Sequence, residues 1–421
     1  MADPRRPRMT VSCQLHRSLQ KTIRSLIIII VIIGLLVHNA KASWLQRPLV
    51  HVFILAGDDN VEGYASLSHL HELATQPATK DRYQHWLMKD DGVTWKSRDD
   101  VFVYYDHERG KPFRHGNLTV KGFGAHANLF GPEVEFGHVL GEFFEEPVLL
   151  IKSAWSGRTL QKDFRPPLGK EPGGFQWFRL LSNIKDAVKH LDTIIGPEYK
   201  HARYDIKGLL WWHGYSDLED VVANRNYKDN LTILLTFMRT KIKSGLPILV
   251  GELGGQGTVN VMKKELDFRE MQKSVVNLAR MRRITTYVPT APYVVQETDP
   301  EAAERDTYQH YSGRADTMMA IGEAMAIAMA EQIMDGVKIA RDEMDRAEIT
   351  TKYRSSHQEV AFLSIAILIG TLAYIVYAIR RGNLPEPGFQ RLETVLWGPS
   401  RREKRKRRKN RRNNGGEIEI T

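Results

Sequence analysis

The chain has 421 residues, with 60 Lys and Arg against 50 Asp and Glu, which gives a formal net charge of +10. The positive charge lies at the two ends, because residues 1–42 carry +6 and residues 380–421 carry +8, which leaves −4 for residues 43–379. A mildly acidic central part argues against nucleic-acid binding by the folded core.

An apolar segment, Leu26–Val37, lies near the N-terminus, with basic residues before it and a small-x-small motif at residues 40–42. A basic flank, a short apolar run and such a motif are typical of a secretory signal peptide. Twelve residues are short for a membrane span, but an uncleaved signal anchor is the alternative. We therefore expect residues 1–42 to be a signal peptide or signal anchor. The single cysteine, Cys13, lies in this segment, so the domain has no internal disulfide.

Residues 43–340 predict one α/β domain, in which short apolar strands alternate with helices. This alternation is typical of a doubly wound parallel sheet, whose functional residues lie on loops after the carboxyl ends of the strands. The expected strands are Val50–Leu55, Pro147–Ile151, Ile206–Trp212, Pro247–Val250 and Ile284–Val288, and the expected helices are Pro132–Phe144, Phe175–His190, Tyr227–Lys243, Lys263–Arg280 and Thr317–Ile333.

The C-terminal part predicts a membrane anchor. Charged and polar residues 341–359 predict a stalk, and residues 360–379 form an uncharged run of 20 residues. At about 1.5 Å per residue, such a helix covers the ~30 Å hydrocarbon core of a bilayer. The basic residues 380–421 then place this end in the cytoplasm and the domain in the lumen or outside the cell. The tail is either a solvated topology determinant or a segment that binds anionic lipid headgroups.

Two N-glycosylation sequons, at Asn117 and Asn230, are compatible with a luminal or extracellular domain. Both are short patterns, so they add little to the argument from charge and hydropathy. The predicted localisation is therefore a single-pass membrane protein with a luminal or extracellular domain.

Five short motifs follow the predicted strands or begin helices. They are AGDDNVEG at residues 56–63, GPEVEFG at 131–137, IKSAWSGRTL at 151–160, GLLWWHGYSD at 208–217 and HYSG at 310–313. In order and spacing they resemble the motifs of the sialate O-acetylesterase and acetylxylan esterase group of the SGNH hydrolase superfamily, over about residues 49–333. The resemblance implies a three-layer α/β/α fold and hydrolysis of acetyl esters on an acetylated carbohydrate, with no cofactor.

In that family a serine attacks the ester carbonyl, a histidine acts as base, and backbone and side-chain donors hold the oxyanion. By position, the resemblance makes His310 the base. Asp306, four residues before His310, stands near the place of the aspartate that the superfamily often has three residues before the histidine. The residues expected at the oxyanion or substrate are Gly157, a backbone donor, His213, which replaces a glutamine donor, Asn60 and Trp155.

Asp59 stands where the family has its nucleophilic serine. A carboxylate is a poor acyl-transfer nucleophile, because the intermediate expels the carboxylate more readily than the more basic sugar alkoxide. Loss of the nucleophile alone costs a serine hydrolase roughly 10⁶-fold in turnover.

Three alternatives remain for a site with Asp59 at its centre. Asp59 and His310 together act as a general base on water, without a covalent intermediate. Alternatively, Asp58, Asp59, His213 and His310 bind a divalent metal that activates water, although no resident metal is expected. In the third alternative Asp59 only caps the following turn, and the domain is a catalytically inactive glycan-binding or adaptor protein.

Overall fold

The computed structural model describes residues 47–336 except residues 88–90, 92, 108–111, 256, 260, 282 and 296–307, and for residues 308–310 it describes the backbone alone. The predicted signal segment at 1–42, the stalk at 341–359, the transmembrane helix at 360–379 and the basic tail at 380–421 lie outside the described residues. No helix in the described part is long and apolar enough to cross a bilayer.

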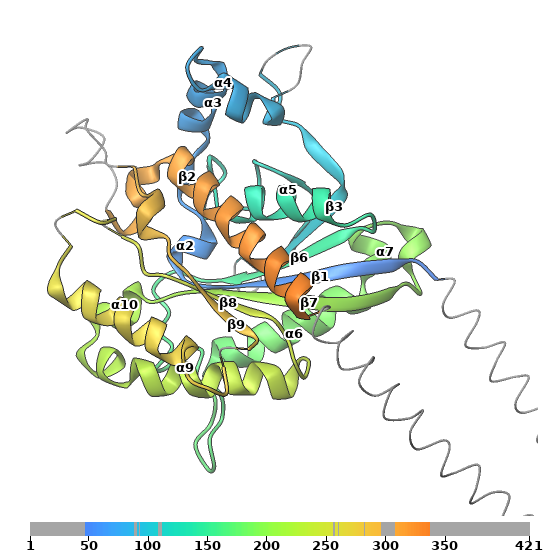
Figure 1. Cartoon of the computed structure of the whole chain (residues 1–421). Coiled ribbons are helices and arrows are strands. Elements are labelled where there is room, and N and C mark those ends of the chain that lie inside the picture. Colours follow the sequence, from blue (N-terminus) through green and yellow to red (C-terminus); the bar gives the residue numbers. More distant parts are fainter. Residues whose placement is uncertain are drawn as a thin grey trace, which may run out of the picture. The chain divides into compact units, whose positions relative to one another are not determined.

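A seven-stranded sheet in the order β4-β3-β6-β1-β7-β8-β9 forms the centre of the domain (Figure 1). All neighbouring strands are parallel except β3 and β4, which pair antiparallel at one edge. Strand β1 lies between β6 and β7, and later parts of the chain add strands on both sides of it. The loops after these central strands therefore run to opposite sides and leave room for a site. The strands are β1 (Leu49–Gly57), β3 (Ser97–Tyr105), β4 (Arg114–Thr119), β6 (Val148–Ala154), β7 (Arg203–Trp212), β8 (Ile248–Gly251) and β9 (Thr285–Val288), with a separate antiparallel pair, β2 (Ala65–Ser66) and β5 (Leu129–Phe130).

Helices cover both faces of the sheet, which confirms the three-layer α/β/α class (Figure 1). One layer contains α5 (Glu133–Phe143) and the helical residues 315–336, with α3 (Leu67–Thr75), α4 (Lys80–Tyr83) and η1 (Gln84–Trp86) beside them. The other layer contains α6 (Phe175–Lys189), α7 (Leu191–Ile194), α9 (Val221–Lys241) and α10 (Lys263–Val276). The short helices are α2 (Asp59–Glu62), α8 (Tyr215–Glu219), η2 (Pro197–Tyr199), η3 (Ala291–Tyr293) and η4 (Tyr308–Gly313).

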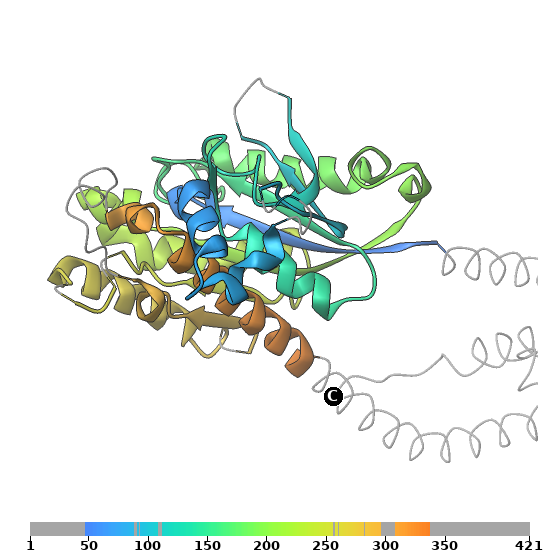
Figure 2. The same cartoon turned by 90° about the horizontal axis from the view of Figure 1, so that it is seen from above.

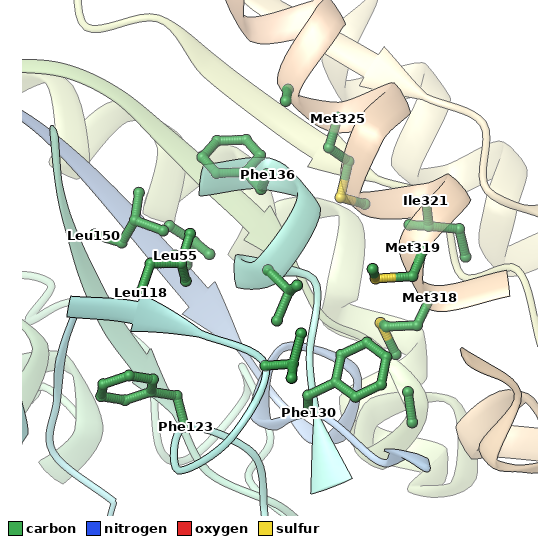
Figure 3. Close-up of a cluster of buried hydrophobic side chains, with 14 of the residues drawn as sticks. Leu55, Leu118, Phe123, Phe130, Phe136, Leu150, Met318, Met319, Ile321 and Met325 are labelled. Carbon is green, nitrogen blue, oxygen red and sulfur yellow. The ribbon is translucent and has the colours of Figure 1, made fainter. Parts of the chain in front are cut away.

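The central strand β1 is almost entirely apolar because it supplies both cores. Phe53 and Leu55 point into the core under α5 and residues 315–336, while Val52 and Ile54 point into the core over α6 and α9. Side chains alternate across a strand, so a strand that is buried on both faces has apolar residues on both. The one polar side chain of β1, His51, is buried, and its Nε2 lies 3.1 Å from Oε2 of Glu146. Figure 3 shows part of the first core, in which the labelled side chains include Leu55, Leu118 and Leu150 from the sheet, Phe136 of α5, and Met318, Met319, Ile321 and Met325 of helix 315–336.

The five predicted strands and the five predicted helices are all present, with ends that differ by a few residues. The sequence analysis missed β3 and β4, which extend the sheet beyond β6. The first half of β3 contains Arg98, Asp99 and Asp100, and β4 is a polar, partly exposed edge strand. Neither segment has the continuous apolar pattern of a buried parallel strand, which was the pattern used for prediction.

Candidate active site

The loops after the central strands meet at the carboxyl edge of the sheet. Strand β1 leads into Asp58 and into α2, which begins at Asp59, and β7 leads into His213. A Cβ on Gly57 would lie 2.0 Å from the carbonyl oxygen of Trp212, so only glycine permits this approach of the two strands. The Asp58 carboxyl then accepts hydrogen bonds from the backbone N–H groups of Gly214 (2.9 Å) and Tyr215 (3.2 Å).

Two adjacent carboxyl groups are buried at the start of α2. Asp58 is 0% exposed and Asp59 is 7% exposed. Burial, together with the negative charge of Asp59, raises the pKa of Asp58 to about 8, so Asp58 holds a proton at pH 7. Oδ1 of Asp59 has no hydrogen-bond partner among the described residues, and Asp58, at the N-cap position of α2, makes no side-chain cap hydrogen bond. Burying a carboxylate without a partner is costly, so helix capping does not account for Asp59.

The loop at residues 156–158 is attached on both sides of Gly157. Before it, the backbone N–H of Ser156 donates to Oε2 of Glu62 (2.8 Å). After it, Nε2 of His213 donates to the carbonyl oxygen of Arg158 (2.8 Å). Gly157 has φ 69°, and nothing lies within 4 Å of the position of a Cβ. Within the described part of the chain the N–H of Gly157 is in no hydrogen bond, as a preorganised oxyanion donor requires.

His213 positions this loop. A carbonyl oxygen only accepts, so the ring proton lies on Nε2, and burial lowers the pKa of His213 and keeps the ring neutral. Nδ1 has no hydrogen-bond partner among the described residues. A neutral His213 therefore has no second N–H for an oxyanion, and the predicted donor role would require a protonated ring in a buried position.

The other predicted substrate residues lie beside the loop. Trp155 is only 5% exposed, its Nε1 donates to the carbonyl oxygen of Asp106 (2.8 Å), and the guanidinium of Arg179 lies 4.4 Å from its ring centre. Trp155 thus supports the loop from below and offers little surface to a sugar. Asn60 is buried in α2, and its Oδ1 has no hydrogen-bond partner within the described range.

The backbone of His310 lies in η4, which contacts α2, so the structure brings the turns of Asp59 and His310 together. The next two residues, Tyr311 and Ser312, have φ angles of 57° and 51°, which are unfavourable for residues with a side chain. The ring of Tyr311 stacks on Trp212 at the end of β7, with ring centres 5.8 Å apart, and this contact fixes the turn. The side chain of His310 and the whole of Asp306 lie outside the described residues.

Sequence analysis missed a buried ion pair beneath the site. Lys152 of β6 is fully buried, and its Nζ donates to Oε2 of Glu133 (2.8 Å) and to the carbonyl oxygens of Glu62 (3.0 Å) and Phe123 (2.5 Å). The other oxygen of Glu133 accepts from the N–H of Gly131 (3.0 Å). Lys152 and Glu133 both lie in motifs quoted above. The charged side chain of Lys152 within an otherwise apolar strand is the sequence signal that could have predicted the pair.

The predicted metal ligands at this edge are only partly within the described residues. Asp58, Asp59 and His213 do not make up a three-ligand cluster among the residues that the structure describes. The fourth predicted ligand, the imidazole of His310, lies outside those residues.

The three-layer α/β/α fold, with its mostly parallel sheet and its loops at the carboxyl edge, fits the SGNH hydrolase-like fold class. Residues 49–331 match the family described as carbohydrate esterase, sialic acid-specific acetylesterase. Because the match covers well over half of the chain, the chain belongs to this family, as the sequence motifs predicted.

Similar solved structures have low sequence identity to this chain. A protein from Arabidopsis thaliana is 15% identical, with a TM-score of 0.44, over 67% of this chain and 98% of that one. A carbohydrate acetylesterase from Xanthomonas citri is 14% identical, with a TM-score of 0.36, over 65% of this chain and 55% of that one. NanS is 11% identical, with a TM-score of 0.41, over 69% of this chain and 99% of that one. No curated protein matches the chain.

Proposed function

We propose that the chain is a membrane-anchored carbohydrate esterase that hydrolyses acetyl esters of glycans by direct attack of water, with Asp59 as the general base. The observation that carries the proposal is the buried Oδ1 of Asp59, which has no hydrogen-bond partner in the described part of the chain. A buried carboxylate that neither caps a helix nor pairs with a described cation is typical of a functional group.

The proposed reaction passes through one tetrahedral intermediate, which forms when water attacks the ester and breaks down when the ester C–O bond is cleaved. The water oxygen bonds to the acetyl carbon while the water proton moves to Asp59. The N–H of Gly157 stabilises the oxyanion, and its position is fixed by the contacts of Glu62 and His213. The ester C–O bond then breaks, and the leaving sugar oxygen receives a proton by way of His310. General-base catalysis contributes about 10²–10⁴-fold, so turnover is expected to be slow for this family.

A catalytically inactive, glycan-binding domain is the second candidate. The observation that favours it is the hydrogen bond from His213 to Arg158, because it uses the only N–H of the neutral ring. With Asp59 in place of serine and no donor from position 213, two parts of the family's machinery are absent. This domain would bind acetylated glycans at the same edge of the sheet without hydrolysing them.

Hydrolysis separates the two candidates. The full-length chain, purified in detergent, is assayed with a chromogenic acetyl ester and with O-acetylated sialic acid. Loss of turnover in Asp59→Asn and in His310→Ala, but not in the exposed control Asp99→Asn, supports the esterase. Glycan binding without turnover, unchanged by either substitution, supports the inactive candidate.

The chemical route has its own test. A single turnover in ¹⁸O-labelled water is followed by mass spectrometry of the peptide that contains Asp59. Direct attack of water puts the label into acetate and leaves Asp59 unlabelled, whereas ¹⁸O in the Asp59 carboxyl would show a covalent intermediate and refute the general-base route. Asp59→Ser tests the rest of the site, because an intact pocket should then catalyse serine-type hydrolysis.

Membrane anchoring and a luminal or extracellular location form part of the proposal. Their support is the charge and hydropathy of residues 360–421, and the two sequons provide a readout. Asn117 is exposed on β4, whereas Asn230 is buried in α9 and its Nδ2 donates to Gln161 (2.6 Å). Expression in cells should give one glycan that is removed by Asn117→Gln and unaffected by Asn230→Gln. A chain without glycan that stays in the soluble fraction would contradict this topology.

A further inference from the structure

We propose that His85, Glu135 and His138 form a binding site for a divalent transition-metal ion of the zinc type, separate from the Asp59 site. One nitrogen of each histidine and one carboxylate oxygen all lie within 4.8 Å of one another. The three residues also line a cavity of about 290 Å³. Two imidazoles and a carboxylate are a common ligand set for zinc, and the cavity leaves room for a water molecule or an exogenous ligand at the fourth position.

Three segments that are far apart in the sequence build this cavity. His85 comes from η1, and Glu135 and His138 lie three residues apart on α5, which places them on one face of that helix. Met319 and Glu323 of helix 315–336 complete the wall. Figure 2 shows these three segments, in blue, teal and orange, on the same side of the sheet. A metal ion here would therefore link η1 to α5.

The spacing of the ligands fits one tetrahedral ion. Nε2 of His85 lies 3.3 Å from Oε1 of Glu135. Ligand atoms that are each about 2.0–2.2 Å from zinc in a tetrahedron lie roughly 3.3–3.5 Å apart. Nε2 of His85 is buried and makes no hydrogen bond within the described residues, although 37% of the His85 side chain is exposed. The distance between Nε2 of His85 and Oε1 of Glu135 is thus that of two atoms bound to the same metal ion, and the two atoms do not have the geometry of a hydrogen bond.

The charges around the three residues partly oppose one another. Burial lowers the pKa of His138. Burial acts to raise the pKa of Glu135, but the nearby imidazole of His85 and the hydrogen bond from Trp86 hold it below its ordinary value. Two further carboxylates at the cavity wall are paired, Glu323 with Arg82 (3.0 Å) and Glu142 with Arg98 (2.6 Å), so the Glu135 carboxylate is the anionic ligand of the site.

Two existing hydrogen bonds bear on metal binding. Nε1 of Trp86 donates to Glu135 (2.9 Å) and can orient the carboxylate while it binds an ion. Nη1 of Arg98 lies 2.9 Å from Nδ1 of His138 and donates to it, so metal binding by either ring nitrogen must break this bond. Arg98 keeps Asp100 and Glu142 as partners (2.6–2.8 Å), so its charge stays paired. The alternative is a plain ion pair between His85 and Glu135, which needs no contribution from His138.

Zinc affinity tests the site directly. The full-length chain in detergent is titrated with Zn²⁺ in competition with a chromophoric chelator, and one ion per chain is expected. His85→Ala and His138→Ala should each weaken binding at least tenfold, whereas His115→Ala, at an exposed position on β4, should leave it unchanged. Equal zinc affinity in all four proteins, or wild-type binding no tighter than that of the double variant His85→Ala/His138→Ala, would overturn the proposal.

Two further measurements keep the test independent of folding defects and of the Asp59 site. Zn²⁺ should raise the unfolding temperature of the wild-type chain and leave that of His138→Ala unchanged, because the ion links η1 to α5. Zinc binding should be unaffected by Asp59→Asn. If Asp59→Asn abolishes binding while His138→Ala retains it, the ion belongs to the Asp59 site and the proposed site does not exist.

Discussion

Two of the quoted sequence motifs contain buried ionisable side chains, Lys152 in one and the pair Asp58 and Asp59 in the other. Their environments are opposite. Lys152 is paired with Glu133, and its remaining donors reach two backbone carbonyls. Asp58 and Asp59 are two adjacent buried carboxyl groups with no described cation as partner, of which Asp58 holds a proton at pH 7, and Oδ1 of each lacks a hydrogen-bond partner among the described residues. A paired buried charge fixes the position of backbone segments, whereas an unpaired one stores free energy that a substrate or proton can release. The comparison separates the part of the motifs that holds the loops from the part that carries chemistry.

The largest expected effect is at the paired group. Lys152→Met leaves Glu133 buried without its partner, so the free energy of unfolding should fall by about 3–5 kcal/mol. Denaturant unfolding measures it, with the exposed Lys200→Met as the matched control. The double variant Lys152→Met/Glu133→Leu should recover part of the loss. A loss below about 1 kcal/mol would mean that the pair does not hold the loops.

Asp58→Asn probes the unpaired group through pH. The folded pKa of about 8 is above the unfolded value near 3.9, so the folded state binds more protons between these values. The stability that Asp58 contributes is complete below pH 4 and is lost as the pH rises through 8. Wild-type should lose up to about 4 kcal/mol more than Asp58→Asn between pH 5 and 9, with the loss falling between pH 5 and 8. Parallel pH profiles for the two proteins would contradict the assigned burial of an ionisable group.

The smallest expected effect is at Glu62, which lies between the two regions. Its carbonyl oxygen accepts a hydrogen bond from Lys152, and its carboxylate accepts one from the N–H of Ser156. Glu62→Leu removes the acceptor before Gly157, so kcat for a chromogenic ester should fall about tenfold with a smaller change in KM. Glu62→Gln keeps an acceptor and should retain most of the activity. Equal losses in both variants would show that the charge of Glu62, and not its hydrogen bond, is what matters.

The sequence predicted the fold well because buried parallel strands have a simple pattern. Strands β1, β6 and β7 each contain a short apolar run that leads into a quoted motif, so their carboxyl ends locate Asp59, Gly157 and His213. The partners of those residues were not predictable. That Nε2 of His213 would meet the carbonyl of Arg158 depends on how the loop after β6 turns back, and no local pattern specifies that contact.

Helix 315–336, which follows the His310 turn, packs against the sheet through methionines. Met318, Met319, Met325 and Met329 are at most 2% exposed, and Met329 lies where Gly208 of β7 has no side chain. A peroxide oxidises a thioether only when it can reach the sulfur, so the oxidation rates of these four residues are probes of local opening. The rate at which each becomes a sulfoxide would report how often the helix lifts from the sheet, and hence how firmly the fold holds the segment that carries its predicted base.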